Sequence, residues 1–190
     1  MRNKLIRELE RYHPYNEQEK RDREIILRAL NASDAVFTRQ QREAHMTASA
    51  WIVNRDMTKV LMVYHNLYDS WSWLGGHADG EEDLLAVALR EAREESGILT
   101  VVPVTESIFS VEVLCVNGHE KRGEYISSHL HLNLTYLLMA DESERLSCKP
   151  DENSGVKWVP VSEAAASSAE PWMRERIYPK LNEKLVQWKE

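Results

Sequence analysis

Residues 75–98 constrain the fold of this chain more than any other stretch, because they combine two adjacent glycines, a helical pattern and a cluster of acids. Asp83 suits the N-cap position and Gly97 suits the position just after a helix, so the sequence predicts a helix over residues 84–96. At about 100° per residue, the apolar side chains of this helix fall on one arc of roughly 140°. We expect that arc to be buried, and it comprises Leu84, Leu85, Ala88, Leu89 and Ala92.

Three glutamates crowd the C-terminal end of the predicted helix. Glu91, Glu94 and Glu95 follow the spacing i, i+3, i+4, and Glu95 falls inside the apolar arc. Like charges at i, i+4 cost roughly 0.2–0.5 kcal/mol, the helix dipole disfavours acids at this end, and burial of a carboxylate adds a desolvation cost. A bound divalent cation would reverse all three effects. A solvated acidic face is the simpler alternative, but the position of the acids at the edge of the core favours a metal site.

The same segment resembles the Nudix box, a motif written G-x5-E-x7-R-E-U-x-E-E-x-G-U, in which U is a bulky aliphatic residue. The chain matches this motif at Gly76, Glu82, Arg90, Glu91, Ala92, Glu94, Glu95, Gly97 and Ile98. Ala92 is small for a U position, and Leu74 stands where many members have proline. On a match of this length, the chain is identified as similar to the Nudix hydrolases.

The resemblance implies a reaction and a cofactor. Nudix hydrolases cleave a phosphoanhydride bond in a nucleoside diphosphate linked to another moiety, with Mg²⁺ or Mn²⁺ as the cofactor. Divalent cations bridge phosphate oxygens and activate a bound water, and hard cations of this kind prefer oxygen ligands. By resemblance, Glu94 and Glu95 are the principal metal ligands, and the backbone carbonyl of Gly75 or Gly76 completes the set.

Other positions of the motif have less direct roles by resemblance. Glu91 binds the metal through water, orients a ligand or acts as the base. Arg90 holds a glutamate in place by ion pairing, or alternatively is only an i, i+4 partner of Glu94 on the helix surface. Glu82 precedes the predicted helix and is expected to have a structural role or to lie outside the direct ligands.

A general base often comes from a loop outside the motif in this family. The loop before Trp158 offers Asp151 and Glu152, and Glu152 precedes Trp158 by six residues, a spacing that resembles the position of the base in some members. A solvated loop acid is the equal alternative. Glu152 therefore joins Arg90 and Glu91 as a candidate catalytic residue.

Three histidines and a tryptophan are candidates for substrate binding. His129 and His131 alternate with leucines along one predicted strand, so they share a face with the polar side chains at positions 133 and 135. Such a pair can bind metal, contact substrate or belong to ordinary polar packing. His77 lies in the glycine loop, where it meets phosphate or serves as a turn residue. Trp73 flanks the glycines, as Trp71 does, and either stacks on a base or anchors the core.

Strands mixed with a few helices predict an α/β class, and the resemblance implies a Nudix-type α/β/α sandwich with a mixed β-sheet. Strands are expected over residues 46–53, 59–65, 73–74, 100–103, 108–116, 125–139 and 156–160, with a turn over 117–124. Helices are expected over residues 2–12, 17–30, 162–168 and 171–188, the second of them capped by Asn16. Residues 1–44 are predicted to be a helical extension packed on the core, or alternatively part of a dimer interface or a cover for the substrate. Residues 45–190 then form the Nudix hydrolase domain, which includes the C-terminal helix.

Composition excludes several classes of partner. A net charge of −7 argues against a nucleic-acid duplex. Cys115 and Cys148 are too few for a disulfide framework, and Cys115 is expected to be a small core residue because it lies in an apolar run. No segment reads as a signal peptide or a membrane span, which predicts a cytoplasmic protein without a membrane partner. The expected partner is a small nucleoside diphosphate derivative, and a homodimer is compatible with the family.

Two other functions share this fold by resemblance. One is a non-catalytic module that senses a nucleotide such as ADP-ribose, and such modules often have damaged motifs. The other is an isoprenoid-type diphosphate isomerase, which needs a catalytic cysteine that this sequence does not place near a suitable motif. Every ionisable position of the motif is present here, which favours a hydrolase.

Overall fold

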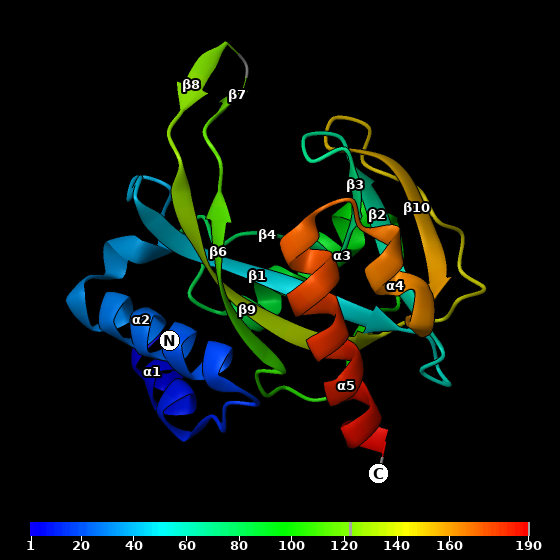
Figure 1. Cartoon of the computed structure of the whole chain (residues 1–190), viewed down its shortest axis with the longest axis horizontal. Helices are drawn as coiled ribbons and strands as arrows, with labels where there is room; N and C mark the ends of the chain where they lie inside the picture. The colour runs from blue at the N-terminus through cyan, green and yellow to red at the C-terminus, as the bar shows by residue number, and fades with distance from the viewer. Residues whose placement is uncertain (122, 190) are drawn as a thin grey trace. The chain divides into compact units, whose positions relative to one another are not determined.

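The structure is a computed structural model that describes residues 1–121 and 123–189, and its elements are labelled in Figure 1. Its contacts divide the chain into two compact units. The first unit comprises Met1–Ser49, Gly76–Val87 and Glu106–Tyr136, and the second comprises Ala50–Gly75, Ala88–Thr105 and Leu137–Glu190. Among the described residues, no helix has both the length and the apolar character that a membrane span requires.

The first unit joins a helical part to β-strands. Its helical elements are α1 (Arg2–Arg11), α2 (Glu17–Ala32) and a short 3₁₀ turn, η1 (Asp34–Phe37). Strand β6 (Ser110–Val116) lies wholly in this unit, which also contains the first residues of β1 (Ala44–Val53) and β9 (His129–Met139) and the last residues of β4 (Leu74–His77). Strands β6 and β9 pair antiparallel, with Ser110 opposite Thr135 and Val116 opposite His129.

Helix α2 packs against strand β6. The helix begins where predicted, because the Asn16 side chain accepts a hydrogen bond from the backbone N–H three residues later at 2.9 Å. Gln18 Nε2 donates to the carbonyl of Val111 at 3.1 Å, and the backbone N–H of Val113 donates to Asp22 Oδ2 at 2.8 Å. Two polar side chains of the helix therefore bond to the backbone of β6 within the first unit.

The polar stretch after β6 forms a two-stranded ribbon rather than a simple turn. Strands β7 (His119–Lys121) and β8 (Glu124–Ile126) pair antiparallel between β6 and β9, as Figure 1 shows. The expected strand over residues 125–139 is therefore interrupted before β9. The pairing extends past the polar stretch, since His119 lies opposite Ile126 and Glu120 opposite Tyr125. Gly123 adopts the positive φ of 82° that a tight connection needs. Position 122 of the expected turn lies outside the described residues.

The prediction that Cys115 belongs to the core is wrong. Cys115 is exposed near the end of β6, whereas Glu112 on the opposite face of the same strand is fully buried. The side chain of Ser110, which shares a face with Glu112, donates to Glu19 of α2 at 2.8 Å. The apolar run in the sequence did not reveal which face of the strand the helix covers. Cys115 and Cys148 are both free thiols, as expected.

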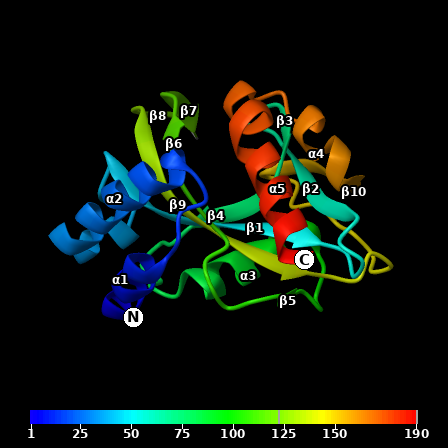
Figure 2. The same cartoon turned by 60° about the horizontal axis from the view of Figure 1, so that its bottom comes forward.

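The second unit is built around β2 (Lys59–His65), whose bounds match the prediction. It pairs antiparallel with β3 (Ser70–Ser72), with β10 (Asn153–Pro160) and, at Val53, with the end of β1. The short strand β5 (Val102–Pro103) pairs with the end of β9. Figure 2 shows α4 (Val161–Ser167) beside β2 and β10, followed by a π-helical turn, η2 (Met173–Ile177), and α5 (Tyr178–Lys189).

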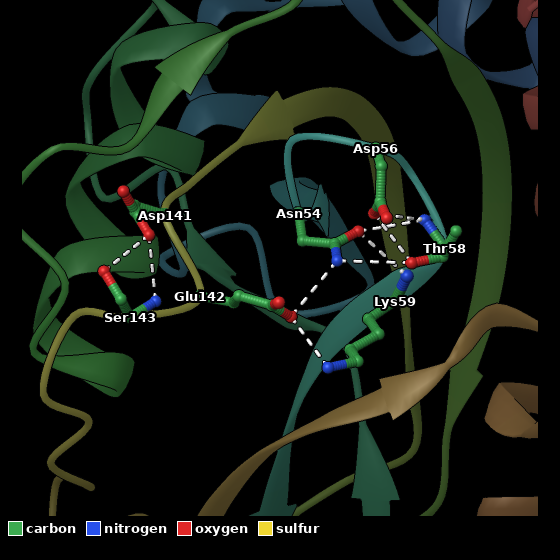
Figure 3. A network of polar contacts seen from close by, with 7 residues as sticks. All are labelled: Asn54, Asp56, Thr58, Lys59, Asp141, Glu142 and Ser143. Carbon is green, nitrogen blue, oxygen red and sulfur yellow. Dashed lines mark hydrogen bonds and ion pairs between the residues drawn. The ribbon is translucent and has the colours of Figure 1, made fainter.

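The turn between β1 and β2 is held by one amide side chain (Figure 3). Asn54 Oδ1 accepts hydrogen bonds from the backbone N–H groups of Thr58 and Lys59, each at 2.9 Å. Asn54 Nδ2 donates to Glu142 Oε2 at 3.1 Å, and Lys59 Nζ lies 2.9 Å from the same oxygen. An asparagine that bonds to its own turn is a common turn device, and here it also fixes an acid from a distant part of the sequence.

Helix α3 (Leu84–Ser96) has the predicted bounds. Asp83 Oδ1 accepts from the N–H of Ala86 at 3.2 Å, as an N-cap does, and Gly97 has the positive φ of 74° expected after the helix. The buried side differs slightly from the expected arc, since the two leucines at positions 85 and 89 are only half-buried and an unexpected valine is fully buried. The buried side chains are Leu84, Val87, Ala88, Ala92, Glu95 and Ser96.

Candidate active site

Glu95 is a buried acid that two neighbours in the second unit hold in place. Its side chain is 3% exposed. The backbone N–H of Gly75 donates to Oε2 at 2.8 Å, and Nδ2 of Asn153 donates to Oε1 at 3.0 Å. The acid therefore links the strand before the helix to the first residue of β10, and each of its oxygens already accepts one hydrogen bond.

Burial raises the pKa of Glu95 to about 7. Hydrogen bonds from Asn153 and Gly75 oppose this rise because they favour the ionised form, whereas the negative charges of Glu91 and Glu152 add to it. A carboxylate with this pKa is poised between its two forms near neutral pH. A cation bound beside Glu95 would favour the ionised form and lower its pKa.

Arg90 forms an ion pair with Glu91, the next residue on α3. Its Nη2 lies 2.8 Å from Glu91 Oε1, and the Glu91 side chain is 12% exposed. The predicted role of Arg90, to hold a glutamate by ion pairing, has Glu91 as its observed partner. Glu91 lies one turn before Glu95 on α3, so two of the three predicted acids are largely shielded from water.

A lysine connects the third acid of the helix to the candidate base. Lys149 Nζ lies 3.6 Å from Glu94 Oε2 and 2.9 Å from Glu152 Oε2. Glu94 and Glu152 are both partly exposed, with 47% and 37% of their side-chain area open to solvent. The loop that contains Glu152 is therefore brought to the end of α3, and Lys149 is the cation that stands between the two carboxylates.

The loop before β10 is shaped by a tight turn. The backbone N–H groups of Glu152 and Asn153 both donate to the carbonyl of Lys149, at 3.0 Å and 2.7 Å. Pro150 occupies the second position of this turn, where its fixed φ is favourable. The N–H of Asn66 donates to the carbonyl of Glu152 at 2.9 Å, which ties the turn to the residue just after β2. The turn therefore directs Lys149, Glu152 and Asn153 toward the acids of α3.

Asn153 was not among the residues that the sequence pointed to, although it follows Glu152 directly. Its side chain is fully buried, and its Oδ1 has no hydrogen-bond partner among the described residues. Buried polar atoms without a partner are uncommon in native proteins. Glu91, Glu94 and Glu95 offer carboxylate oxygens near the end of α3, the ligand chemistry that a hard divalent cation such as Mg²⁺ or Mn²⁺ prefers. Their ligand atoms are not among the described groups that already lie close enough together to hold one ion, so binding would require these side chains to turn toward the cation.

The family model described as the NUDIX domain matches residues 43–181, which is more than half of the chain. The chain belongs to the Nudix family. Its fold is therefore the expected α/β fold with a mixed sheet, with an N-terminal helix and a C-terminal helix. Among curated proteins, none matches the sequence of the chain.

Solved structures share this Nudix fold. An Ap4A hydrolase from C. elegans is 19% identical, covering 76% of this chain and 96% of that protein with a TM-score of 0.53. A NUDIX-family hydrolase from Clostridium perfringens is 21% identical, with coverages of 76% and 97% and a TM-score of 0.54. The dihydroneopterin triphosphate pyrophosphohydrolase of E. coli is 17% identical, with coverages of 75% and 95% and a TM-score of 0.54. Likenesses at this level of identity show the fold.

The three histidines predicted to bind substrate lie together in the first unit of the Nudix fold. The ring centroids of His77 and His131 are 4.9 Å apart, and those of His129 and His131 are 5.1 Å apart. Sequence reasoning missed a fourth member, His45 at the start of β1, whose ring lies 5.0–5.2 Å from each of the other three. It is separated from His77 by 32 positions, and only the arrangement of the strands reveals their proximity.

The remaining polar residues of that face are internal. Asn133 Nδ2 donates to Glu112 Oε2 at 3.0 Å, and Asn133 Oδ1 accepts from the hydroxyls of Thr47 and Ser49, each at 2.9 Å. Thr135 also donates to Glu112, at 2.8 Å. These buried contacts favour the polar-packing interpretation for positions 133 and 135.

Trp73 packs inside the second unit. Its side chain is 9% exposed, its ring meets Tyr178 edge to face with centroids 5.8 Å apart, and its backbone N–H donates to the Tyr178 hydroxyl at 3.0 Å. This environment favours the core-anchor interpretation over contact with substrate. Glu82 accepts a hydrogen bond from the backbone N–H of Arg2 at 2.7 Å within the first unit, and Gly76 lies in β4.

Proposed function

We propose that this Nudix protein is a hydrolase that cleaves a phosphoanhydride bond in a nucleoside diphosphate linked to another moiety, with Mg²⁺ or Mn²⁺ as its cofactor. The observation that carries the proposal is the environment of Glu95, a buried acid with a raised pKa that lies near the negative charges of Glu91 and Glu152 and accepts a hydrogen bond from the buried amide of Asn153. Burial of the Glu95 carboxylate and of the unpartnered amide oxygen costs stability, and a cation bound beside Glu95 would offset that cost.

Each residue has a proposed role in this reaction. Glu94 and Glu95 bind the cation directly, and the carbonyl of Gly76 or its neighbour Gly75 adds a neutral oxygen. Glu91, fixed by Arg90, orients a bound water. When bound, the cation neutralises phosphate charge and lowers the pKa of the attacking water. Glu152 accepts the proton of that water as the general base.

The substrate class rests on the chemistry of the acids and on the structural neighbours. The Ap4A hydrolase and the dihydroneopterin triphosphate pyrophosphohydrolase are named for substrates that contain phosphoanhydride bonds. We extend this chemical class to the present chain without choosing a member of it. The preserved acids support catalysis over a sensing module, which needs only to hold a nucleotide.

A panel of nucleotides with Mg²⁺ or Mn²⁺ tests the proposal. It should include dinucleoside polyphosphates, nucleotide sugars such as ADP-ribose, nucleoside triphosphates and coenzyme derivatives, with products separated by chromatography. At least one compound should be cleaved at its anhydride linkage, and chelation of the metal should stop the reaction. Nucleotide binding without cleavage in the whole panel would instead identify a sensor.

The variant Glu94→Gln should lower turnover about 1000-fold, because it removes a ligand that stabilises transition-state charge worth several kcal/mol. The exposed Glu163 on α4 supplies the matched control, Glu163→Gln, which should retain wild-type turnover. Full activity in Glu94→Gln would remove this residue from the metal site.

A further inference from the structure

Six of the seven histidines of the chain belong to the first unit, and five of these six gather on its strands. They come from four strands and comprise His45 of β1, His77 of β4, His119 of β7, and His129 and His131 of β9. Three of them, His45, His77 and His131, each offer a ring nitrogen, and these three nitrogens lie within 4.8 Å of one another. The three residues are separated by 32 and 54 positions in the sequence, so the strands bring them together.

The ring of His45 is oriented by a backbone carbonyl. Its Nδ1 lies 3.1 Å from the carbonyl of Gln41, so Nδ1 carries the proton and Nε2 carries a lone pair. In metal-binding histidines, the N–H of the second ring nitrogen commonly donates a hydrogen bond to a backbone carbonyl in this way. That bond fixes the tautomer and the direction of the lone pair. His129 is oriented similarly, with Nδ1 2.9 Å from the carbonyl of Ser127.

The lone pair of His45 has no partner among the described residues. The ring is 4% exposed, and its Nε2 is buried without a hydrogen bond. A buried acceptor in this state costs roughly 1–3 kcal/mol relative to a satisfied one. Packing alone does not explain why an unsatisfied nitrogen is placed among three other imidazole rings.

The cluster is better suited to a cation than to an anion. His45 is buried and His77 and His131 are partly buried, so three ring nitrogens meet in a space with little water. Nε2 of His45 presents a lone pair there, because its Nδ1 faces the carbonyl of Gln41. A lone pair binds a metal cation and repels an anion.

We propose that His45, His77 and His131 bind one late first-row transition cation of the Zn²⁺ class, with a fourth position open to water or an anion. Three imidazoles with one open position are a known coordination for zinc. Imidazole nitrogen suits zinc, copper and nickel, whereas Mg²⁺ requires oxygen. In a tetrahedral site with Zn–N bonds of about 2.0–2.1 Å, the nitrogens lie about 3.3 Å apart. Side-chain rotations that close the present spacing by at most about 1.5 Å meet this requirement.

The site has a neighbour and a structural consequence. Nε2 of His129 lies 3.3 Å from Nε2 of His131, so this ring stands beside one of the three proposed ligands. A cation held by the three ligands ties β1, β4 and β9 together within the first unit. Because the folded chain binds the cation and the unfolded chain does not hold these residues together, binding raises the stability of the fold by mass action.

Zinc titration of tag-free, chelator-treated and desalted protein tests the proposal. Isothermal titration calorimetry with ZnCl₂ should give one site with a Kd below about 1 μM, and 10 μM free zinc should raise Tm measurably. Titration with MgCl₂ should leave this site empty. Zinc binding weaker than about 100 μM in the wild-type protein would overturn the proposal.

Two conservative variants and two controls assign the ligands. His77→Gln and His131→Gln should each weaken zinc binding at least 100-fold, whereas His13→Gln, at an exposed histidine outside the cluster, should bind as the wild type does. Circular dichroism should show that all variants are folded, and His45 is left intact because its burial makes a folding defect expected. Wild-type affinity in both His77→Gln and His131→Gln would overturn the ligand assignment.

The test is independent of the proposed hydrolytic function. Glu94→Gln should bind zinc as tightly as the wild type does. A 100-fold loss of zinc affinity in that variant would show that zinc binds at the carboxylates, which would overturn the proposal. Cobalt substitution provides a spectroscopic check, because tetrahedral Co²⁺ absorbs visible light strongly and octahedral Co²⁺ does not. A weak octahedral spectrum would contradict a three-histidine site. Absence of hydrolysis with every substrate would leave all of these results unchanged.

Discussion

The carboxylate site of the second unit and the histidine cluster of the first unit differ in the ligands that they offer to a cation. The carboxylate site gathers negative charge and stabilises it with Lys149, Arg90 and the amide of Asn153. The histidine cluster gathers neutral lone pairs and directs them with backbone carbonyls. Charge favours hard cations and oriented nitrogens favour softer ones, so the two proposed sites are expected to prefer different classes of metal.

The largest effect in this comparison is expected from the candidate base. Glu152→Gln should lower kcat about 10²–10³-fold, because proton transfer by a positioned acid contributes this much to many reactions, while KM changes less than about 3-fold. Steady-state kinetics with the identified substrate measure both values. The neighbouring exposed acid gives the control variant Asp151→Asn, which should keep wild-type kcat. A kcat for Glu152→Gln equal to that of the control would exclude Glu152 as the base.

Glu95 should make the metal-free protein less stable as the pH rises. Its folded pKa of about 7 exceeds the usual value of 4.5, so the folded state binds the extra proton between these two values. The contribution of protonated Glu95 to the free energy of unfolding is therefore fully present below about pH 4.5. It is lost as the pH rises to about 7, and the total loss is about 3 kcal/mol. His45 and His131 act in the opposite direction, because burial lowers their pKa and their contribution to stability is lost as the pH falls below the usual histidine value.

Urea unfolding in chelator at pH 5 and pH 8 measures this effect. Glu95→Gln should remove this contribution, so that the variant gains stability relative to the wild type between pH 5 and pH 8, because glutamine carries no charge and Asn153 can turn its unpartnered oxygen toward the new amide. Glu163→Gln should keep the pH dependence of the wild type. Equal pH dependence in wild type and Glu95→Gln would show that Glu95 ionises normally.

Asn153 should act on the carboxylate site as a positioning residue. Asn153→Ala should weaken Mn²⁺ binding about 10–100-fold, as loss of a partner of a metal ligand commonly does. Saturating metal should restore most of the kcat, which a merely damaged fold would not allow. Electron paramagnetic resonance titration of Mn²⁺ measures the affinity, and Ser154→Ala at the next, exposed position is the control. Unchanged Mn²⁺ affinity in Asn153→Ala would remove this role.

A substitution outside both sites should change stability alone. Asn54→Ala removes the acceptor for two turn N–H groups (Figure 3) and should lower the free energy of unfolding by about 1–2 kcal/mol. Arg55→Ala, at an 88% exposed side chain in the same turn, should change it little. Neither variant should alter the affinity for zinc or Mn²⁺. A shift in either affinity would mean that metal binding depends on the stability of the whole fold, and that a loss of affinity does not identify a ligand.

The sequence predicted the parts of the carboxylate site that lie within one helix. Helix periodicity, a cap and a terminal glycine fixed the bounds of α3, and the spacing of Glu91, Glu94 and Glu95 followed from them. Lys149 and Asn153 were not predicted, because they reach those acids across more than 50 positions. Local patterns carry no information about which loop meets a given helix end.

The histidine cluster shows the same limit more strongly. The alternation along β9 indicated that His129 and His131 share a face, but it did not indicate what that face meets. Local sequence patterns could not predict the role of His45, because the rings that it contacts come from β4 and β9. The exposed Cys115 and the buried Trp73 have a similar explanation, since an apolar or aromatic residue does not reveal which side of its strand is covered.

The position of Lys149 between Glu94 and Glu152 has a consequence for how the proposed cofactor arrives. Its ammonium group is a built-in counter-ion, so a divalent cation that binds Glu94 enters by ion exchange rather than into an open site. Exchange preserves local charge balance, keeps the carboxylates from repelling one another before the metal arrives, and weakens apparent metal affinity. The displaced ammonium remains on a short tether, where it can attract the next anion to approach, and the polyphosphate of a substrate is such an anion.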